Sequence, residues 1–72
     1  MTSIFKQDFA AGKFHISPMT RISESGQFTA LVSIRNGMHD RVFRFNPQFS
    51  SHEEAVRYAV GEAQIWLRDR IA

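Results

Sequence analysis

The amino-acid sequence predicts an α+β fold: an antiparallel β-meander of three or four strands, followed by one C-terminal α-helix packed on one face of it. The first observation is a change in hydrophobic period near residue 50, from an alternation of two to a helical repeat. The second is a set of turn signals that divide the first part into short segments. The third is the length of 72 residues, which suits one small domain. We therefore expect a single domain over 1–72, with an arm or short strand in 1–12, the meander in 13–46 and the helix in 51–71.

The first clear strand is expected over residues 13–22, where apolar side chains alternate. Its inner face carries Phe14, Ile16, Thr20 and Ile22. Pro18 lies inside this strand and cannot donate a ladder hydrogen bond, so we expect the strand at a sheet edge or with a bulge. The preceding residues 4–9 fit either a short fourth strand or an arm that packs on the core.

A second strand over residues 27–35 and a third over 39–45 are expected to form a hairpin. Asn36-Gly37 between them is the strongest short hairpin signal, because both positions tolerate positive φ. A two-residue turn there predicts the cross-strand pairs Phe28 with Phe45 and Ala30 with Phe43 on the inner face, and Leu31 with Val42 on the outer face. A register slipped by one residue would put both phenylalanines outside. The turn chemistry and the hydrophobic pattern therefore favour the same hairpin.

The last segment is expected to be the helix. Ser51 stands three residues before Glu54, which is the spacing of a capping box at a helix start, and Ser50 with Glu53 offers the same box one residue earlier. The stripe that faces the sheet carries Val56, Val60, Ala63, Leu67 and Ile71, with Ala59 and Trp66 on its flank. Gly61 interrupts the helix at a cost of about 1 kcal/mol relative to alanine, and we expect it to permit close packing against the sheet.

Three stretches resemble a set of small, mostly proteobacterial proteins of unknown function. They are Arg41-Val42-Phe43-Arg44-Phe45, Phe49-Ser50-Ser51-His52-Glu53-Glu54-Ala55 and Trp66-Leu67-Arg68-Asp69-Arg70. Those proteins have an aromatic-rich meander followed by one helix, and the match would cover nearly the whole chain. The resemblance implies a bacterial, cytoplasmic protein and brings no activity with it. In architecture alone, the predicted fold is also similar to the single-strand-binding fold of Pur-type proteins, which work as dimers.

The composition excludes several classes of protein. The chain has no cysteine, which removes disulfides, a CxxC redox motif and a cysteine-based zinc site. A hydrophobic fraction of 43% with a net charge of +2 excludes a disordered chain. No apolar run approaches the roughly 20 residues of a transmembrane helix, so we expect no membrane partner. The charge is +3 over residues 1–50 and −1 over residues 51–72, so an anion would meet the meander.

The face of the meander that the helix leaves uncovered is the main candidate interaction surface. Its apolar centre is Leu31 and Val42, with Met19 and His15 nearby, and its basic rim is Lys13, Arg21, Arg35 and Arg44. An apolar centre with an arginine rim is typical of a protein interface. Arginine also binds phosphate, so a weak nucleic-acid-binding face is the alternative, although the aromatic residues that would stack on bases point inward by parity. A third interpretation is an ordinary solvated face with scattered apolar residues.

Three further residues have open interpretations. Tyr58 and Ile65 lie on the side of the helix away from the main stripe, where they fit a helix-to-helix dimer seam, two isolated exposed residues or a contact with the N-terminal arm. Arg41 falls on the inner sheet face near the hairpin end, where we expect it to reach water. The hypothesis that these surfaces favour is a small interaction module that binds another protein or a second copy of itself.

No motif indicates catalysis, a cofactor or a metal. His15, His39 and His52 are not spaced as ligand pairs and have no carboxylate at a ligand spacing, so we expect structural or solvent roles for them. The serine, histidine and acidic residues stand in no catalytic motif order. The glycines are isolated, which excludes a phosphate-binding loop. We therefore expect a non-enzymatic protein without a cofactor or a metal.

Overall fold

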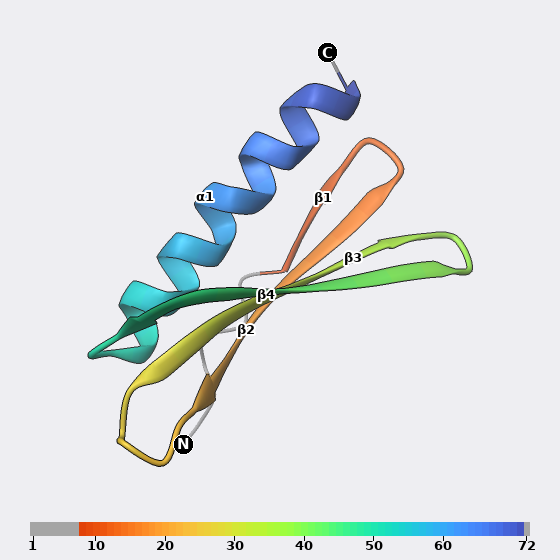
Figure 1. Cartoon of the computed structure of the whole chain (residues 1–72). Helices are drawn as coiled ribbons and strands as arrows, with labels where there is room; N and C mark the ends of the chain where they lie inside the picture. The colour runs from red at the N-terminus through yellow and green to blue at the C-terminus, as the bar shows by residue number, and fades with distance from the viewer. Residues whose placement is uncertain (1–7, 72) are drawn as a thin grey trace.

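The computed structural model describes residues 8–71 of the chain (Figure 1). Its elements are β1 (Phe9–Ala11), β2 (Phe14–Ile22), β3 (Phe28–Asn36), β4 (His39–Phe49) and α1 (His52–Ile71). The strands form one antiparallel sheet in the order β1-β2-β3-β4, and α1 packs on one face of it. The predicted α+β meander with one C-terminal helix is thereby confirmed. Its fourth strand is β1, and the earlier part of the segment expected at residues 4–9 lies outside the described residues.

The first hairpin is short on its β1 side. β1 pairs only with the start of β2, as far as Phe9 opposite Ile16. Lys13, which was expected to begin a strand, lies in the turn between β1 and β2. β2 lies between β1 and β3, so the expectation of a strand at a sheet edge is wrong for β2. Pro18 pairs with Val32 of β3 in a register without a shift, so β2 has no bulge there either. The described pairs of β1 with β2 end at Ile16.

The β3–β4 hairpin has the predicted faces but not the predicted register. Asn36 pairs with His39, so the turn is Gly37-Met38 and not Asn36-Gly37. Gly37 has a φ of 64°, and no non-glycine residue of the described chain has a positive φ, which is the pattern of a type II′ turn. The observed pairs include Val32 with Phe43, Leu31 with Arg44 and Ile34 with Arg41, a shift of two residues from the expected ones. A shift of two leaves every side chain on its face, so the hydrophobic pattern fits both registers.

β4 extends beyond the predicted end of the third strand through an irregular stretch. Leu31 lies opposite Arg44, but Thr29 lies opposite Gln48, so three residues of β4 face one residue of β3. Pro47 is one of those three residues. A proline is tolerated there because β4 is the last strand of the sheet. Asn46 and Pro47 therefore lie in a bulge of β4 and do not end the strand.

α1 begins where the capping signal predicts. The amide of Glu54 donates to Ser51 Oγ at 3.2 Å, and Ser50 Oγ donates to Glu54 Oε1 at 3.0 Å. The helix buries Ala55, Val56, Ala59, Ala63 and Leu67, whereas Val60 is half-buried. The close packing expected at Gly61 is wrong, because a Cβ atom added there would meet no atom within 4 Å. The residues that let the helix approach the sheet are the alanines on its buried stripe.

The buried core is small, and no aromatic side chain of the described chain is fully buried. Among the residues whose burial the structure describes, nine hydrophobic ones are buried, four of them alanine, and the largest fully buried side chains are Ile16 and Val32. The partly buried aromatic residues around them are Phe9, Phe14, Phe28, Phe43, Phe45, Phe49, Tyr58 and Trp66. The aromatic side chains stay partly exposed because the single helix is narrower than the sheet beneath it.

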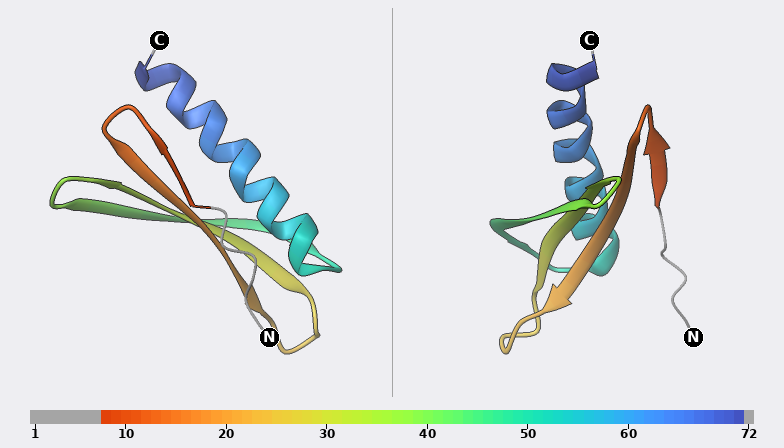
Figure 2. Two further views of the ribbon diagram at one scale, coloured as in Figure 1. Left: turned by 180° about the vertical axis from the view of Figure 1, so that it is seen from behind. Right: turned by 90° about the vertical axis from the view of Figure 1, so that its right-hand side faces the viewer.

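A single helix is about 10–12 Å across. The outermost axes of four strands are about 14 Å apart, and the sheet is twisted so strongly that its two hairpins splay apart (Figure 2). α1 contacts β3 and β2 more than β4. α1 therefore covers the inner face of β4 less than the inner faces of β2 and β3.

Candidate interaction surfaces

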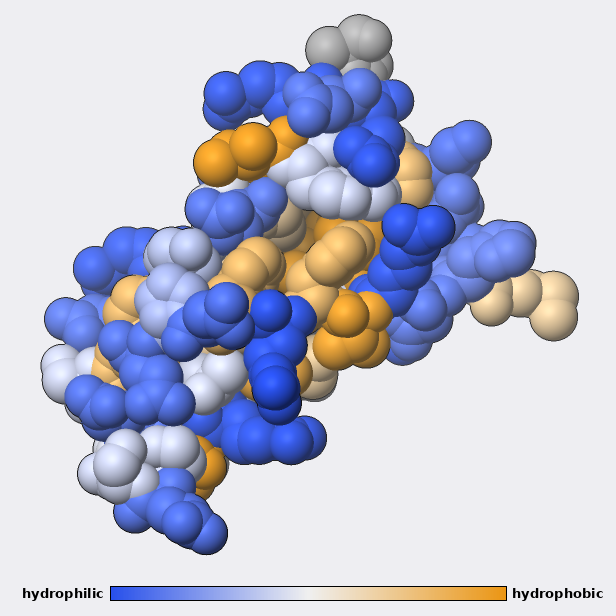
Figure 3. All heavy atoms as spheres, in the orientation of Figure 1, coloured by the Kyte–Doolittle hydropathy of each residue, from blue (hydrophilic) through white to orange (hydrophobic). Residues whose placement is uncertain are grey.

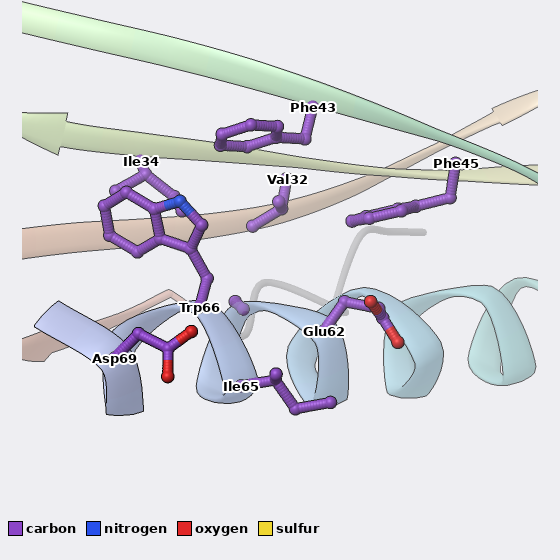
Figure 4. Close-up of a pocket in the computed structure, with 9 residues that line it drawn as sticks. Val32, Ile34, Phe43, Phe45, Glu62, Ile65, Trp66 and Asp69 are labelled. Carbon is purple, nitrogen blue, oxygen red and sulfur yellow. The ribbon is translucent and has the colours of Figure 1, made fainter.

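A groove opens where α1 stands away from β4, and we call it the α1–β4 groove. It has a volume of about 250 Å³ and is lined by Val32, Ile34, Phe43 and Phe45 of the sheet and by Glu62, Ala63, Ile65, Trp66 and Asp69 of the helix. In Figure 4 the sheet residues lie on one side of the gap and the helix residues on the other, and Trp66 reaches across it. Figure 3 shows apolar side chains gathered in a hollow between polar ones. The groove thus has an apolar centre and an acidic helix rim.

Aromatic rings connect α1 to β4 at both ends of this groove. The Tyr58 ring centroid lies 5.4 Å from that of Phe45 and 5.1 Å from that of Phe49. The Trp66 and Phe43 centroids are 6.2 Å apart. These separations are in the range of favourable aromatic pairs. The rings hold the helix to β4 without closing the space between Tyr58 and Trp66.

The two residues predicted for a helix seam lie on the flank of α1 that faces β4. Tyr58 is half-buried against the sheet, so the interpretation as an isolated exposed residue is wrong for it. Ile65 is 53% exposed and lines the α1–β4 groove. The hydrophobic period of the helix could not predict that Tyr58 and Ile65 face β4. It does not show which strands the helix covers, and α1 lies over β2 and β3 with one flank above β4. The groove therefore brings Ile65 together with aromatic residues of the third predicted strand.

A second hollow of about 320 Å³ continues the groove past Ile34 and Trp66, and we call it the basic end. Its other lining residues are Phe14, Asn36, His39, Arg41 and Arg70. The Arg70 Cζ atom lies 4.1 Å from the centre of the Trp66 ring, which is a cation–π contact. Arg41 is exposed although it pairs with buried Ile34, as expected for an arginine that reaches water from an inner-face position. One continuous surface thus carries carboxylates along one part and guanidinium groups along another.

Most of the residues predicted for the outer-face surface lie on the sheet face opposite α1. They are His15, Met19, Arg21, Leu31, Arg35, Val42 and Arg44, whereas Lys13 lies in a turn. Val42 is 58% exposed and Met19 39% exposed, but Leu31 is half-buried. In the observed register Leu31 lies between Met19 and Arg44, and Val42 lies opposite Ser33. Guanidinium and hydroxyl groups therefore interrupt the apolar centre that the sequence predicted.

A row of polar side chains, which inspection of the sequence did not identify, crosses the same outer face. Ser17 Oγ donates to Asp8 Oδ2 at 3.2 Å, and Ser33 Oγ donates to Asp40 Oδ1 at 2.7 Å. The two serines are direct cross-strand partners. His15 Nε2 lies 3.4 Å from Asp8 Oδ2. Asp40 alternates in step with the predicted outer-face residues, so the sequence pattern places it on the outer face. Asp8 can be placed there only when the register of β1 is known. The outer face therefore has mixed charge.

The arginines of the chain make no ion pair within residues 8–71, where His15 with Asp8 is the single pair. Ion pairs among the described residues therefore do not explain why seven of the nine basic residues are arginine. His52 Nδ1 lies 2.6 Å from Thr20 Oγ1, which gives this histidine a structural contact. No three metal-ligating side chains gather among the described residues. In that same part of the chain, no helix combines the length and the apolar character needed to span a membrane.

Comparison with known proteins finds no matching family model, no matching curated protein and no matching solved structure. The case for a function therefore comes from the geometry and the charge of the surfaces just described.

Proposed function

We propose that the chain is a non-enzymatic interaction module that forms a homodimer through the α1–β4 groove. The partial burial of Phe43 and Phe45 carries this proposal, because both rings lie beside a hollow that α1 does not fill. Ile65 adds a side chain that is 53% exposed on the opposite wall. Removing apolar surface from water is worth about 25 cal/mol per Å². A partner that covered these three side chains would gain that free energy.

The distribution of charge favours a second copy of the chain as this partner. Glu62 and Asp69 lie on the helix rim of the groove, and Arg41 and Arg70 lie at its basic end. A two-fold interface brings one surface against itself, so the acidic part of each copy can meet the basic part of the other. A partner of uniform charge would be attracted to one part and repelled by the other.

Sedimentation equilibrium from micromolar to near-millimolar protein tests the homodimer. We expect Ile65→Asp to weaken dimerisation at least about tenfold, equal to about 1.4 kcal/mol, because it places a charge in the apolar centre of the contact. Gln64→Asp is the matched control, because Gln64 is the exposed neighbour that does not line the groove. A wild-type monomer at all concentrations, or equal effects of the two substitutions, would refute the proposal.

The arrangement of polar groups supports the non-enzymatic part of the proposal. The two carboxylates of the α1–β4 groove, Glu62 and Asp69, are seven residues apart on one helix. That spacing separates their backbone positions by about 10.5 Å along the axis, more than the separation at which paired carboxylates act on one bond. On the outer face, Ser17 and Ser33 each donate to an aspartate and not to a histidine. The proposed cytoplasmic location rests on the resemblance described above.

Weak nucleic-acid binding by the outer face is a second candidate. It is supported by Arg21, Arg35 and Arg44, which form no ion pair within the described residues. Asp8 and Asp40 on the same face oppose it, because they repel phosphate. Titration with single-stranded and duplex DNA and RNA at low salt, followed by amide chemical shifts, tests this candidate. Shifts around Arg35 that vanish as salt rises would support it, and unchanged spectra would remove it.

A further inference from the structure

β4 offers a free edge to a partner strand. It is the last strand of the sheet, and within the described residues it pairs with β3 alone. The backbone N–H and C=O groups along such an edge are a template for another strand. The irregular stretch around Pro47 interrupts the second half of β4, so its regular edge runs over residues 39–44.

We infer that two copies of the chain pair antiparallel along this edge, centred on Val42, so that their two sheets become one. The inference rests on the proposed homodimer and specifies its contacts. In this register Asp40 lies opposite Arg44 of the partner subunit, and Val42 lies opposite Val42 of the partner subunit. Val42 is 58% exposed in the single chain, and the partner would cover it. Opposite charges and apolar pairs at directly opposed positions stabilise a sheet.

Other two-fold registers fit this edge less well. A pairing centred on Arg41 or on Arg44 places two guanidinium groups directly opposite each other, which is destabilising. A pairing centred on Phe43 places Val42 opposite Arg44 of the partner subunit and leaves Asp40 without an opposite charge. Registers shifted by one residue would put the two helices on opposite faces of the joined sheet. Among the two-fold registers centred on residues 41–44, the one centred on Val42 satisfies both the charges and the faces.

The same register completes the α1–β4 groove on the inner face. Arg41 comes to lie opposite Phe43 of the partner subunit. In each copy Phe43 lines the groove whose helix rim carries Glu62 and Asp69. Arg41 is exposed and makes no ion pair within the described residues, so its guanidinium group is available to the partner's ring and carboxylates. Each copy thus supplies the cation that the other copy's groove lacks.

The centre of this contact can be tested directly, because the chain has no cysteine of its own. Directly opposed residues of an antiparallel pair have Cα atoms about 4.5–5.5 Å apart, within the range of about 4.4–6.8 Å that a disulfide spans. Val42→Cys should therefore form an interchain disulfide in most of the protein under mild oxidation. Met19→Cys is the matched control, because Met19 is exposed on the same face but lies on β2. Equal cross-linking of both variants, or none for Val42→Cys in a dimeric protein, would overturn the register.

An exchange of charges tests the register independently of cysteine. Asp40→Arg and Arg44→Asp each place like charges opposite one another, and each should raise the dimer dissociation constant about tenfold. The double variant, or an equimolar mixture of the two single variants, restores the opposite pairs and should restore dimerisation. Arg21→Asp is the control, because Arg21 is an outer-face arginine away from the β4 edge. Far-UV circular dichroism checks that each variant is folded.

The outcomes separate this inference from the proposed function. A dimer that is sensitive to Ile65→Asp but insensitive to both charge reversals would overturn the β4 pairing and leave the groove-mediated homodimer in place. Folded double and mixed variants that stay monomeric would also overturn the pairing. A wild-type chain that is monomeric at all concentrations would overturn both.

Discussion

Replacing Gly61 with alanine should stabilise the protein. Gly61 lies inside α1, and a Cβ atom added there would meet no atom within 4 Å. Alanine is favoured over glycine in a helix interior by about 0.8–1.0 kcal/mol, mainly because it has fewer unfolded conformations to lose. Since the methyl group displaces nothing, we expect the free energy of unfolding to rise by that amount.

The expected change is large enough to measure in a chain of this size. For a domain of 60–100 residues, about 1 kcal/mol corresponds to a rise of about 4–8 °C in Tm. Urea and thermal unfolding, followed by far-UV circular dichroism, give the free energy and the Tm. All variants are compared at one protein concentration, because a dimer would make the Tm depend on concentration.

Gly26 supplies the control for this prediction. A Cβ atom added at Gly26 would also meet nothing within 4 Å, but its φ is 87°. Gly26 and Gly61 therefore differ in backbone conformation but not in the room available for a Cβ atom. Gly26→Ala should lower the stability by about 1 kcal/mol or more, because an L side chain is strained at positive φ. If Gly61→Ala left the stability unchanged, or if both substitutions acted in the same direction, the reasoning from backbone conformation would be refuted.

Three further substitutions test the capping, the polar contact and the packing, all by urea unfolding. Ser51→Ala should lower the free energy of unfolding by about 1 kcal/mol through loss of the helix cap, and an unchanged value would contradict the cap. Thr20→Val should lower it by about 1 kcal/mol, because the hydroxyl contact with His52 is lost; equal stability would mean that this contact contributes nothing. Ala59→Leu should lower it by about 1–3 kcal/mol by overpacking a fully buried position, whereas Gln64→Leu on the exposed side should change it by less than about 0.5 kcal/mol.

The faces of the sheet could be predicted from the sequence, but its register could not. Period-two alternation places Phe43 inside and Val42 outside in either register, because a shift of two residues preserves parity. The turn signal had to decide between them, and Asn36-Gly37 fits a type I′ turn as well as Gly37 fits the first position of a type II′ turn. The structure has the second turn. The pairing of Ser33 with Val42, and hence the polar row on the outer face, follows from that register.

The α1–β4 groove could not be predicted from the hydrophobic pattern at all. The pattern assigns Phe45 to the inner face and Ile65 to a flank of the helix, but it carries no information on which strands the helix covers. That depends on where the helix axis lies relative to the strands. Tyr58 illustrates the difference, because the pattern placed it away from the sheet, whereas in the structure its ring packs edge-to-face with Phe45 and tilted against Phe49.

The alanines that build the core are also the reason that the groove stays open. Ala55, Ala59 and Ala63 are fully or almost fully buried, so α1 packs closely over the middle of the sheet. A helix held close over β2 and β3 cannot also cover β4, because its width is fixed at about 10–12 Å. It reaches β4 through the rings of Tyr58 and Trp66. Larger residues at these positions would raise the helix without widening it, and the inner face of β4 would remain uncovered. Full burial of Phe43 and Phe45 therefore requires a further layer beside α1, and the free edge of β4 is where a second copy could supply it.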